Sequence, residues 1–207
     1  MYQDKREHII TKAIELFAEK GFEGSSIRDL ATIADVNIAM VNYYFGSKEK
    51  LYEAVIEKRV LYMRDFIDNV LSNTSLSLID QLDLIIDGFV IRFLSDPLYH
   101  RVLQQELLVS KRAHMHERII ELIIKNAKDV INIIDKGIRN KAFKKADPEL
   151  IFASILGTIS QVMLSKTLCN RLMDKPIEFD PYSDKKIQER LSSHIKQFVH
   201  ALLIINK

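Results

Sequence analysis

The stretch GFEGSSIRDLATIADVNIAMVNYYFGSKEKL, residues 21–51, predicts two short helices joined by a tight turn. Ser26 stands before an apolar segment and is followed three residues later by Asp29, a capping-box arrangement that starts a helix. Asn37 is a suitable N-cap for a second helix over 38–45. Short helix, tight turn and short helix form a helix-turn-helix, whose second helix lies in the major groove of DNA. The stretch therefore predicts a DNA-binding motif.

The second helix of this motif has an outward face without charge. A helical wheel directs toward the protein Val41, Tyr44, Phe45 and, in part, Ile38. It directs outward Ala39, Met40, Asn42 and Tyr43. An uncharged face suits a helix in a DNA groove, because Ala39 permits close approach and Asn42 can pair with an adenine edge. Tyr43 can donate to a phosphate and pack on a sugar. The alternative is a helix buried beneath other protein.

Two cations near the motif are candidate DNA contacts. Lys48 stands in the first turn of the next helix, where a cation opposes the helix dipole unless an anion binds there, so it predicts a phosphate contact. Glu49 could neutralise it as an ordinary surface pair instead. Arg28 could reach a base or a phosphate, or could simply be solvated. Over residues 25–50 three basic and three acidic residues cancel, so affinity would come from a few placed contacts, doubled by dimerisation.

The stretch 21–51 closely resembles the N-terminal DNA-binding domain of the TetR family of bacterial transcriptional regulators. The resemblance covers about residues 6–55 and includes the SSIRDLA helix and the YYF-x-SKE-x-L ending. It implies that the second helix of the domain approaches DNA and that the third lines the groove. The DNA-contacting residues that it implies are Ser26, Ile27, Arg28, Asn37, Ile38, Ala39, Met40, Asn42, Tyr43, Tyr44 and Lys48.

The chain departs from the family pattern at three positions. Asp35 stands where the family usually has Gly, and Asp tolerates the left-handed backbone conformation better than most residues. Ala39 replaces a common Gly and Asn42 a common Tyr. These last two changes are expected to alter which bases are contacted, and not whether DNA is bound.

The rest of the chain predicts helices throughout, so the fold class is all-α. Apolar residues recur at three- and four-residue spacing, and six Gly and four Pro are too few for an all-β chain. A long helix runs from Ser47 to about Leu71 without a flexible linker. Five more helices are expected near 76–94, 97–109, 113–140, 147–172 and 184–205, about nine in all. We expect a three-helix DNA-binding domain over 1–50 and a helical effector-binding and dimerisation domain over 51–207.

The last two predicted helices suit pairing with a second copy. Apolar residues near a 3.5-residue period form a stripe at Ile187, Leu191, Ile195, Phe198, Leu202 and Ile205. Small residues that permit close helix approach form a strip at Ala153, Ser154, Gly157 and Ser160. The TetR resemblance implies that these helices form a four-helix bundle with their copies. The alternative is that the stripes bury core within one chain. The interface candidates are Ala153, Gly157, Ser160, Leu191, Ile195, Phe198 and Leu202.

The middle helices are rich in large apolar residues, where the resemblance implies a pocket for a small-molecule effector. The candidate lining residues are Phe89, Phe93, Leu103, Leu107, Met115, Ile119 and Ile159. Aromatic and Met residues at helical spacing also fit an ordinary core, and the identity of the effector is open.

Patterns of catalysis, metal binding and membrane insertion are missing from the sequence. His114 and His116 are two residues apart and so point to different helix faces. Cys169 is the only cysteine, which excludes an intramolecular disulfide and a Cys-based zinc site. No apolar run approaches the ~18–20 residues of a membrane span. No enzyme activity, cofactor, metal or membrane partner is therefore expected, and the expected location is the bacterial cytoplasm, at the nucleoid.

Together these patterns predict a homodimeric, ligand-responsive transcriptional regulator. We expect a repressor that binds a palindromic operator on double-stranded DNA and is released by a small-molecule effector. The alternative is an architectural DNA-binding protein of the same fold without an effector, with a role in nucleoid organisation or cell division.

Overall fold

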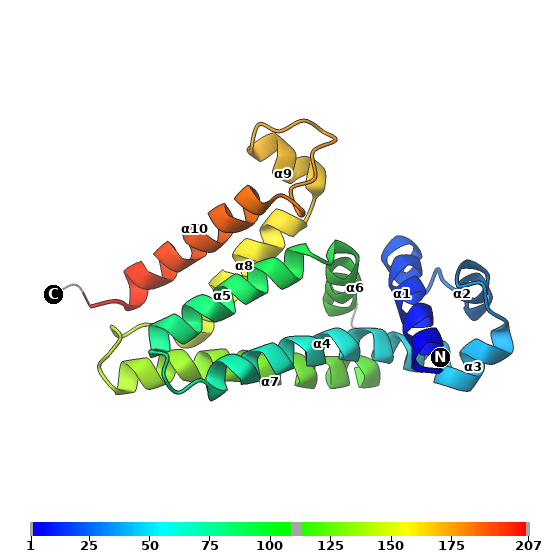
Figure 1. The fold of residues 1–207 in the computed structure, drawn as a ribbon, viewed down its shortest axis with the longest axis horizontal. Helices are drawn as coiled ribbons and strands as arrows, with labels where there is room; N and C mark the ends of the chain where they lie inside the picture. The colour runs from blue at the N-terminus through cyan, green and yellow to red at the C-terminus, as the bar shows by residue number, and fades with distance from the viewer. Residues whose placement is uncertain (1, 109–112, 206–207) are drawn as a thin grey trace. The chain divides into compact units, whose positions relative to one another are not determined.

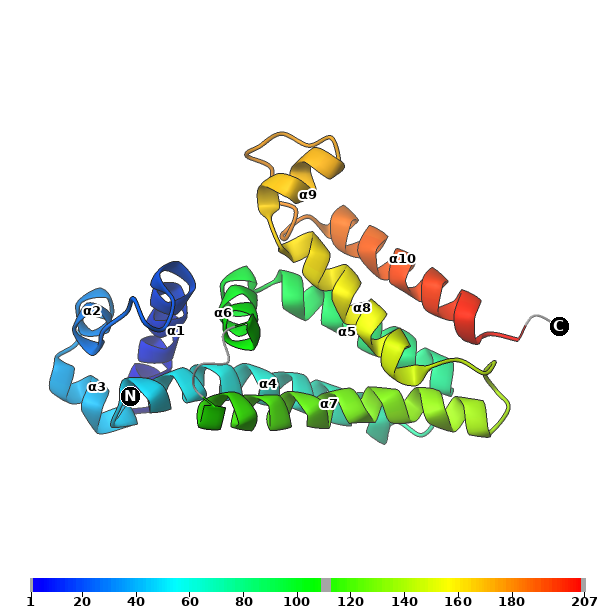
Figure 2. The same ribbon diagram turned by 180° about the vertical axis from the view of Figure 1, so that it is seen from behind.

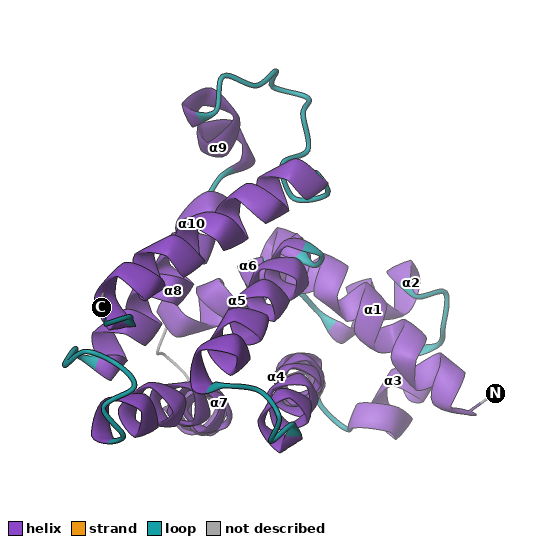
Figure 3. Cartoon of the chain, turned by 60° about the vertical axis from the view of Figure 1, so that its left-hand side comes forward, coloured by secondary structure: helices purple, strands orange, loops and turns teal. Residues whose placement is uncertain are grey.

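The structure is a computed structural model that describes residues 2–108 and 113–205. All regular elements in these ranges are helices, which confirms the all-α prediction (Figure 3). Side chains are described over 5–108 and 116–205. The helices are α1 (Tyr2–Lys20), α2 (Ile27–Ile33), α3 (Ile38–Phe45), α4 (Lys48–Ser72), α5 (Leu78–Leu94), α6 (Pro97–Leu108), α7 (Ala113–Arg139), α8 (Pro148–Met163), α9 (Lys166–Leu172) and α10 (Lys185–Leu203).

Packing divides the chain into two compact units. Unit 1 comprises Met1–Met63 and Leu98–Ile123, and unit 2 comprises Arg64–Pro97 and Ile124–Lys207. Helices α4 and α7 each contribute residues to both units. The functional boundary expected after residue 50 stays a prediction, because it concerns what the segments do.

The predicted helix ends of the DNA-binding motif are confirmed. Gly21 and Gly46 end α1 and α3 with φ of 69° and 78°, a conformation that glycine adopts without steric cost. Ser26 and Asp29 form the full capping box at the start of α2. The side chain of Asn37 accepts a hydrogen bond of 2.7 Å from the first turn of α3. Local capping chemistry therefore sets the limits of both short helices.

The core of unit 1 contains an aromatic cluster formed by Phe17, Phe22 and Tyr52. The ring of Tyr52 lies edge-on to both phenylalanines, with centroids 4.9 Å from Phe17 and 5.0 Å from Phe22. Its hydroxyl donates to the carbonyl of Val102, 3.3 Å away. Because these residues come from α1, the turn that follows it, α4 and α6, the cluster fixes these four segments together (Figure 1).

In unit 2, α5 packs against α10 and α8 (Figures 1 and 2). The apolar contact is flanked by polar pairs between α5 and α10. His200 Nε2 lies 2.8 Å from Asp83 Oδ1, and Lys196 Nζ lies 2.5 Å from Asp87 Oδ2. Ser192 donates to the same Asp87 carboxylate. The register between the two helices is therefore specified by charge as well as by apolar packing.

The single helix expected over 147–172 is wrong. The described chain has two helices there, α8 and α9, separated by a short break (Figure 2). The two are bent by 96°, and the described residues form ten helices where about nine were expected. Ser165 causes the break: its backbone is extended, with φ −155° and ψ 120°, and its side chain accepts from the backbone N–H of Leu168 at 3.3 Å. No single described helix is both long and apolar enough to cross a membrane, and α8 and α9 pass that test only together.

The apolar stripe of α10 also differs from the expected one. Its buried residues follow a four-residue spacing at Ile187, Leu191, Ile195, Val199 and Leu203. Phe198 and Leu202 lie on the neighbouring face and are about 40% exposed. The expected residues average 3.6 per step, the repeat of a straight helix, and so stay on one side of it, whereas each four-residue step of the buried set advances ~40° around the helix. Two of the interface candidates, Leu191 and Ile195, are therefore buried against their own chain.

Gly88 in the middle of α5 provides a test of this packing. A Cβ at Gly88 would lie 2.1 Å from Cε1 of Phe66. Gly→Ala inside a helix usually stabilises by ~0.5–1 kcal/mol. Here we expect Gly88→Ala to lower the free energy of unfolding by ~1–3 kcal/mol because the methyl group overpacks the ring. Urea unfolding measures the effect. In a protein that also carries Phe66→Ala, the Gly88→Ala change should instead raise the free energy of unfolding. If Gly88→Ala raised it with Phe66 present as well, the packing of Phe66 against Gly88 would be contradicted.

Candidate nucleic-acid interface

The turn between α2 and α3 is a tight left-handed turn at Asp35. Asp35 has φ of 51°, and the N–H of Val36 donates to the carbonyl of Ala31 at 3.0 Å. The carbonyl of Ala34 lies 3.0 Å from His8 Nε2 on α1. Asp therefore adopts here the backbone conformation for which glycine is the usual choice, as expected from its tolerance of positive φ.

Helix α3 presents one buried face and one exposed face. Val41 and Phe45 are buried in the core of unit 1. On the other face Ala39 and Asn42 are exposed, and Tyr43 is 71% exposed. The exposed face is thus uncharged, and it is not covered by other described parts of the chain.

Two α3 side chains lie at the border between these faces. Ile38 is 40% exposed, in keeping with its partly inward place on the wheel. Met40, predicted to point outward, is half-buried and packs against the core. It lies ~100° from the centre of the inward face, and its long flexible side chain can fold back over that edge. Tyr44 is half-buried, with its ring centroid 5.5 Å from that of Tyr43.

Two predicted DNA contacts use side-chain atoms to cap helices. The Ser26 hydroxyl donates to Asp29 Oδ2 at 2.7 Å and accepts from the Asp29 backbone N–H at 3.1 Å. The bond from Ser26, together with the charge of Lys20, holds the pKa of the Asp29 carboxyl below its ordinary value. Asn37 Oδ1 accepts from a backbone N–H, which leaves the side-chain NH₂ as the donor that DNA could use. Capping thus limits how both residues could contact a phosphate.

Lys48 differs most from its predicted role as a phosphate contact. Its ammonium donates to the carbonyls of Phe22 at 2.9 Å and Ser25 at 3.0 Å, and it lies 4.1 Å from the centroid of the Phe22 ring. An ammonium has three N–H donors, so two of them hold the turn between α1 and α2. The sequence reasoning missed this role, because the spacing between residues 22 and 48 gives no local signal of the contact. A phosphate contact by Lys48 stays a prediction.

The remaining predicted contacts lie on α2. Arg28 is exposed and Ile27 is half-buried. Asp29, next to Arg28, lies 3.9 Å from Lys20 Nζ. Arg6 from α1 lies over the ring of Phe45, with its guanidinium carbon 5.3 Å from the centroid. The cations around α3 therefore come from neighbouring helices, and α3 itself carries none.

The candidate effector-pocket residues divide between the two units. Phe89, Phe93 and Ile159 belong to unit 2, where the rings of Phe89 and Phe93 lie 6.0 Å apart. Leu103 and Ile119 are buried in the core of unit 1, as an ordinary core role would predict. The other two candidates of unit 1 are Leu107, which is 36% exposed, and Met115, whose side chain lies outside the described residues. The pocket stays a prediction.

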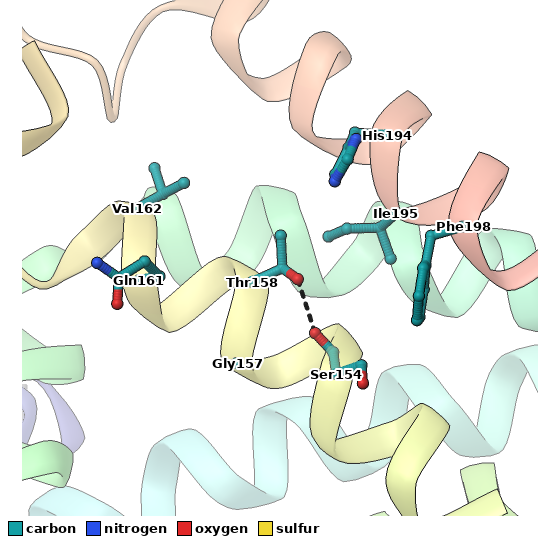
Figure 4. A pocket seen from close by; sticks show the side chains of 8 residues that line it. All are labelled: Ser154, Gly157, Thr158, Gln161, Val162, His194, Ile195 and Phe198. Carbon is teal, nitrogen blue, oxygen red and sulfur yellow. Dashed lines mark hydrogen bonds between the residues drawn. The ribbon is translucent and has the colours of Figure 1, made fainter. Parts of the chain in front are cut away.

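Three of the candidate dimer residues, Gly157, Ile195 and Phe198, line a groove between α8 and α10 (Figure 4). The groove has a volume of about 600 Å³. Its lining consists of Ser154, Gly157, Thr158, Gln161, Val162, His194, Ile195 and Phe198. Among the other interface candidates, Ala153 is exposed and Ser160 is half-buried. A Cβ at Gly157 would meet no atom within 4 Å, so the surface is open there. The groove thus has Ser154, Gly157 and Thr158 on its α8 wall and His194, Ile195 and Phe198 on its α10 wall.

Three leucines outside the predicted interface residues are also exposed. The exposed fraction is at least 65% for Leu150 on α8, Leu164 at the end of α8 and Leu172 on α9. The sequence reasoning missed them because it treated 147–172 as one helix with one buried face. Each is a large exposed apolar side chain of the kind that interaction surfaces contain.

Within the described residues, no three His, Cys, Asp or Glu side chains gather as metal ligands would. Cys169 is buried, and burial raises the pKa of its thiol. A reactive thiol needs a lowered pKa and access to solvent. Cys169 therefore serves as a small buried hydrophobe.

The sequence similarity to known proteins lies in the N-terminal segment. A family model described as "Bacterial regulatory proteins, tetR family" matches residues 9–55. Over 52 residues the chain is 44% identical to the HTH-type transcriptional repressor NicS of Pseudomonas putida. The aligned segment makes up 25% of this chain and 24% of NicS. The match thus spans about a quarter of the length of this relative.

The similarity to solved structures extends over nearly the whole chain. The ketosteroid transcriptional regulator KstR2 of Mycobacterium tuberculosis has a TM-score of 0.76 and 14% identity, covering 97% of this chain and 95% of that one. A bacterial regulatory protein in the tetR family from Rhodococcus RHA1 has a TM-score of 0.74 and 21% identity, covering 94% and 96%. All three of these proteins are named as regulators or repressors. Residues 9–55 thus carry the N-terminal module of the tetR family of bacterial regulatory proteins, and the chain has the fold of that family's transcriptional regulators.

Proposed function

We propose that the protein is a transcriptional repressor that binds a palindromic operator through α3. The observation that carries this proposal is the exposed, uncharged face of Ala39, Asn42 and Tyr43 on a helix whose other face is held in the core. Such a face offers hydrogen-bonding and apolar groups to base edges. The name of NicS, a transcriptional repressor, supports repression. A repressor of this kind acts where the bacterial chromosome lies, in the cytoplasm at the nucleoid.

We propose that two copies bind together through the groove between α8 and α10. A helix-turn-helix dimer contacts two half-sites about one DNA turn (~34 Å) apart or a multiple of it, so dimerisation doubles the few contacts that one copy makes. The small side chains of Ala153 and Gly157 and the exposed Phe198 and Leu202 support this interface. Leu191 and Ile195 would support it from beneath, because they are buried under that surface.

We propose that a small apolar molecule controls the repressor. The abundance of large apolar residues in α5 and α6 supports this, as does the name of KstR2, a ketosteroid regulator. A ligand that binds more tightly to a dimer geometry that does not match the operator shifts the population toward that geometry. The fraction of dimers that fits the operator then falls.

Tyr43→Ala tests the DNA-binding surface. We expect this variant to weaken binding to its operator by ~1 kcal/mol or more, roughly fivefold in Kd, because a groove and backbone contact is lost. The probe is the DNA upstream of the protein's own coding region, in a gel shift at low salt. Tyr62→Ala is the matched control, since Tyr62 is also exposed but lies on α4. Equal affinity of the Tyr43 variant and the wild type would count against the proposal.

Lys48→Met separates the two roles of Lys48. Methionine keeps the apolar stem over Phe22 and removes both ammonium hydrogen bonds, so we expect the free energy of unfolding to fall by ~1–3 kcal/mol. The slope of the logarithm of the operator association constant against the logarithm of the salt concentration should stay unchanged if the ammonium contacts only the protein. A slope smaller by ~1 per protomer, with unchanged stability, would instead assign Lys48 to phosphate. Lys50→Met is the control, because Lys50 is exposed.

Gly157→Leu tests the dimer. Because the position is open, we expect the single chain to fold with unchanged or slightly higher stability, since leucine forms helices better than glycine by ~0.5–1 kcal/mol. The added side chain should block close approach of a second copy, and sedimentation should show monomers where the wild type shows dimers. Lys128→Leu, an exposed position on α7, should stay dimeric. Dimers of unchanged affinity in the Gly157 variant would place the interface elsewhere.

A further inference from the structure

We infer that α3 recognises an A·T-rich half-site, with Ile38 and Ala39 contacting thymine methyl groups and Asn42 pairing with adenine. This inference rests on the proposed DNA-binding function and adds the base composition of the operator to it.

The N-terminal turn of α3 offers apolar side chains to the groove. Ile38 is 40% exposed and Ala39 is exposed. The N-terminal residues of a recognition helix are those that contact base edges. The thymine C5-methyl is the apolar group that the bases present in the major groove. An apolar first turn therefore matches thymine better than any other base.

Asn42 lies one helical turn after Ile38 on the same side of α3. Its amide offers one acceptor and an NH₂ donor, the pattern that pairs with adenine N7 and N6. Four residues span about 6 Å along a helix, close to two base-pair steps of ~3.4 Å. The two side chains are thus placed to contact nearby A·T pairs in one half-site.

Side chains that would recognise guanine are missing from α3. Arg or Lys to guanine is the commonest specific contact in the major groove, and α3 contains neither. The cations near it are engaged with the protein: Lys48 donates to two backbone carbonyls and Arg6 lies over the Phe45 ring. Arg28 lies on α2, the helix that crosses the DNA backbone in this motif. The centre of the half-site therefore lacks a guanine-reading group.

The experiment has two stages and uses the full chain. Duplexes are first selected from a random library, and the enriched core should be A·T-rich. Each thymine of that core is then replaced by deoxyuridine, which removes the methyl group and keeps every hydrogen bond. We expect at least one such replacement to raise Kd about fivefold or more. The Ile38→Ala variant should bind the thymine duplex more weakly than the unmodified protein does. Replacing the same thymine by deoxyuridine should then weaken the binding of this variant no further.

Ile33→Ala is the matched control. Ile33 is 42% exposed, like Ile38, but lies on α2, so this variant should keep the preference for thymine over deoxyuridine. Asn42→Ala should lose selection for adenine at one position while the other positions are kept. Selective binding to a G·C-rich core, or full affinity for the deoxyuridine duplexes, would overturn this inference and leave the proposed function intact. Folded protein that enriches no sequence at all would overturn the proposed function itself.

Discussion

The contact between the first turns of α4 and the turn that follows α1 determines how the DNA-binding surface is held. Lys48 and Tyr52 are one helical turn apart on α4, and both contact the ring of Phe22, at 4.1 Å and 5.0 Å. Lys48 also closes the turn by donating to its carbonyls, including that of Ser25. A half-buried ammonium with two carbonyl acceptors is costly to disrupt, because its loss leaves those acceptors without a donor. The start of α2 is therefore tied to α4 by charge and by aromatic packing.

The anchored inner face of α3 explains how its outer face can do without charge. Val41 and Phe45 supply the burial that holds the helix in place, so its exposed residues need not contribute to folding. With no net charge over residues 25–50, attraction to phosphates is weak, and non-specific DNA binding depends mainly on that attraction. In the proposed repressor, such a surface would gain its selectivity from base contacts and shape, and its affinity from two copies binding together.

The features that the sequence predicts best are those encoded locally. Capping residues such as Ser26 and Asn37 set the limits of α2 and α3, and positive φ at Gly21 and Gly46 ends α1 and α3, so local residue chemistry is enough to place the whole motif. The break at Ser165 was missed because the apolar pattern runs on through it. The role of Lys48 was missed because its partners lie 23 and 26 residues away. Contacts between distant segments leave no mark in local spacing, and for the same reason spacing alone does not separate pocket-lining residues from core residues such as Leu103 and Ile119.

Two glycines in the middle of helices of unit 2 differ in what surrounds them. At Gly88 the space of a side chain is filled by Phe66, so the single chain itself requires glycine there. At Gly157 a side chain would meet nothing within 4 Å. Glycine inside a helix costs ~1 kcal/mol relative to alanine, and nothing within the described part of the chain offsets that cost at Gly157. A second helix in close contact would offset it, because a surface without a Cβ lets two backbones approach. The open glycine therefore favours an interface at α8, beside the exposed Phe198 of α10.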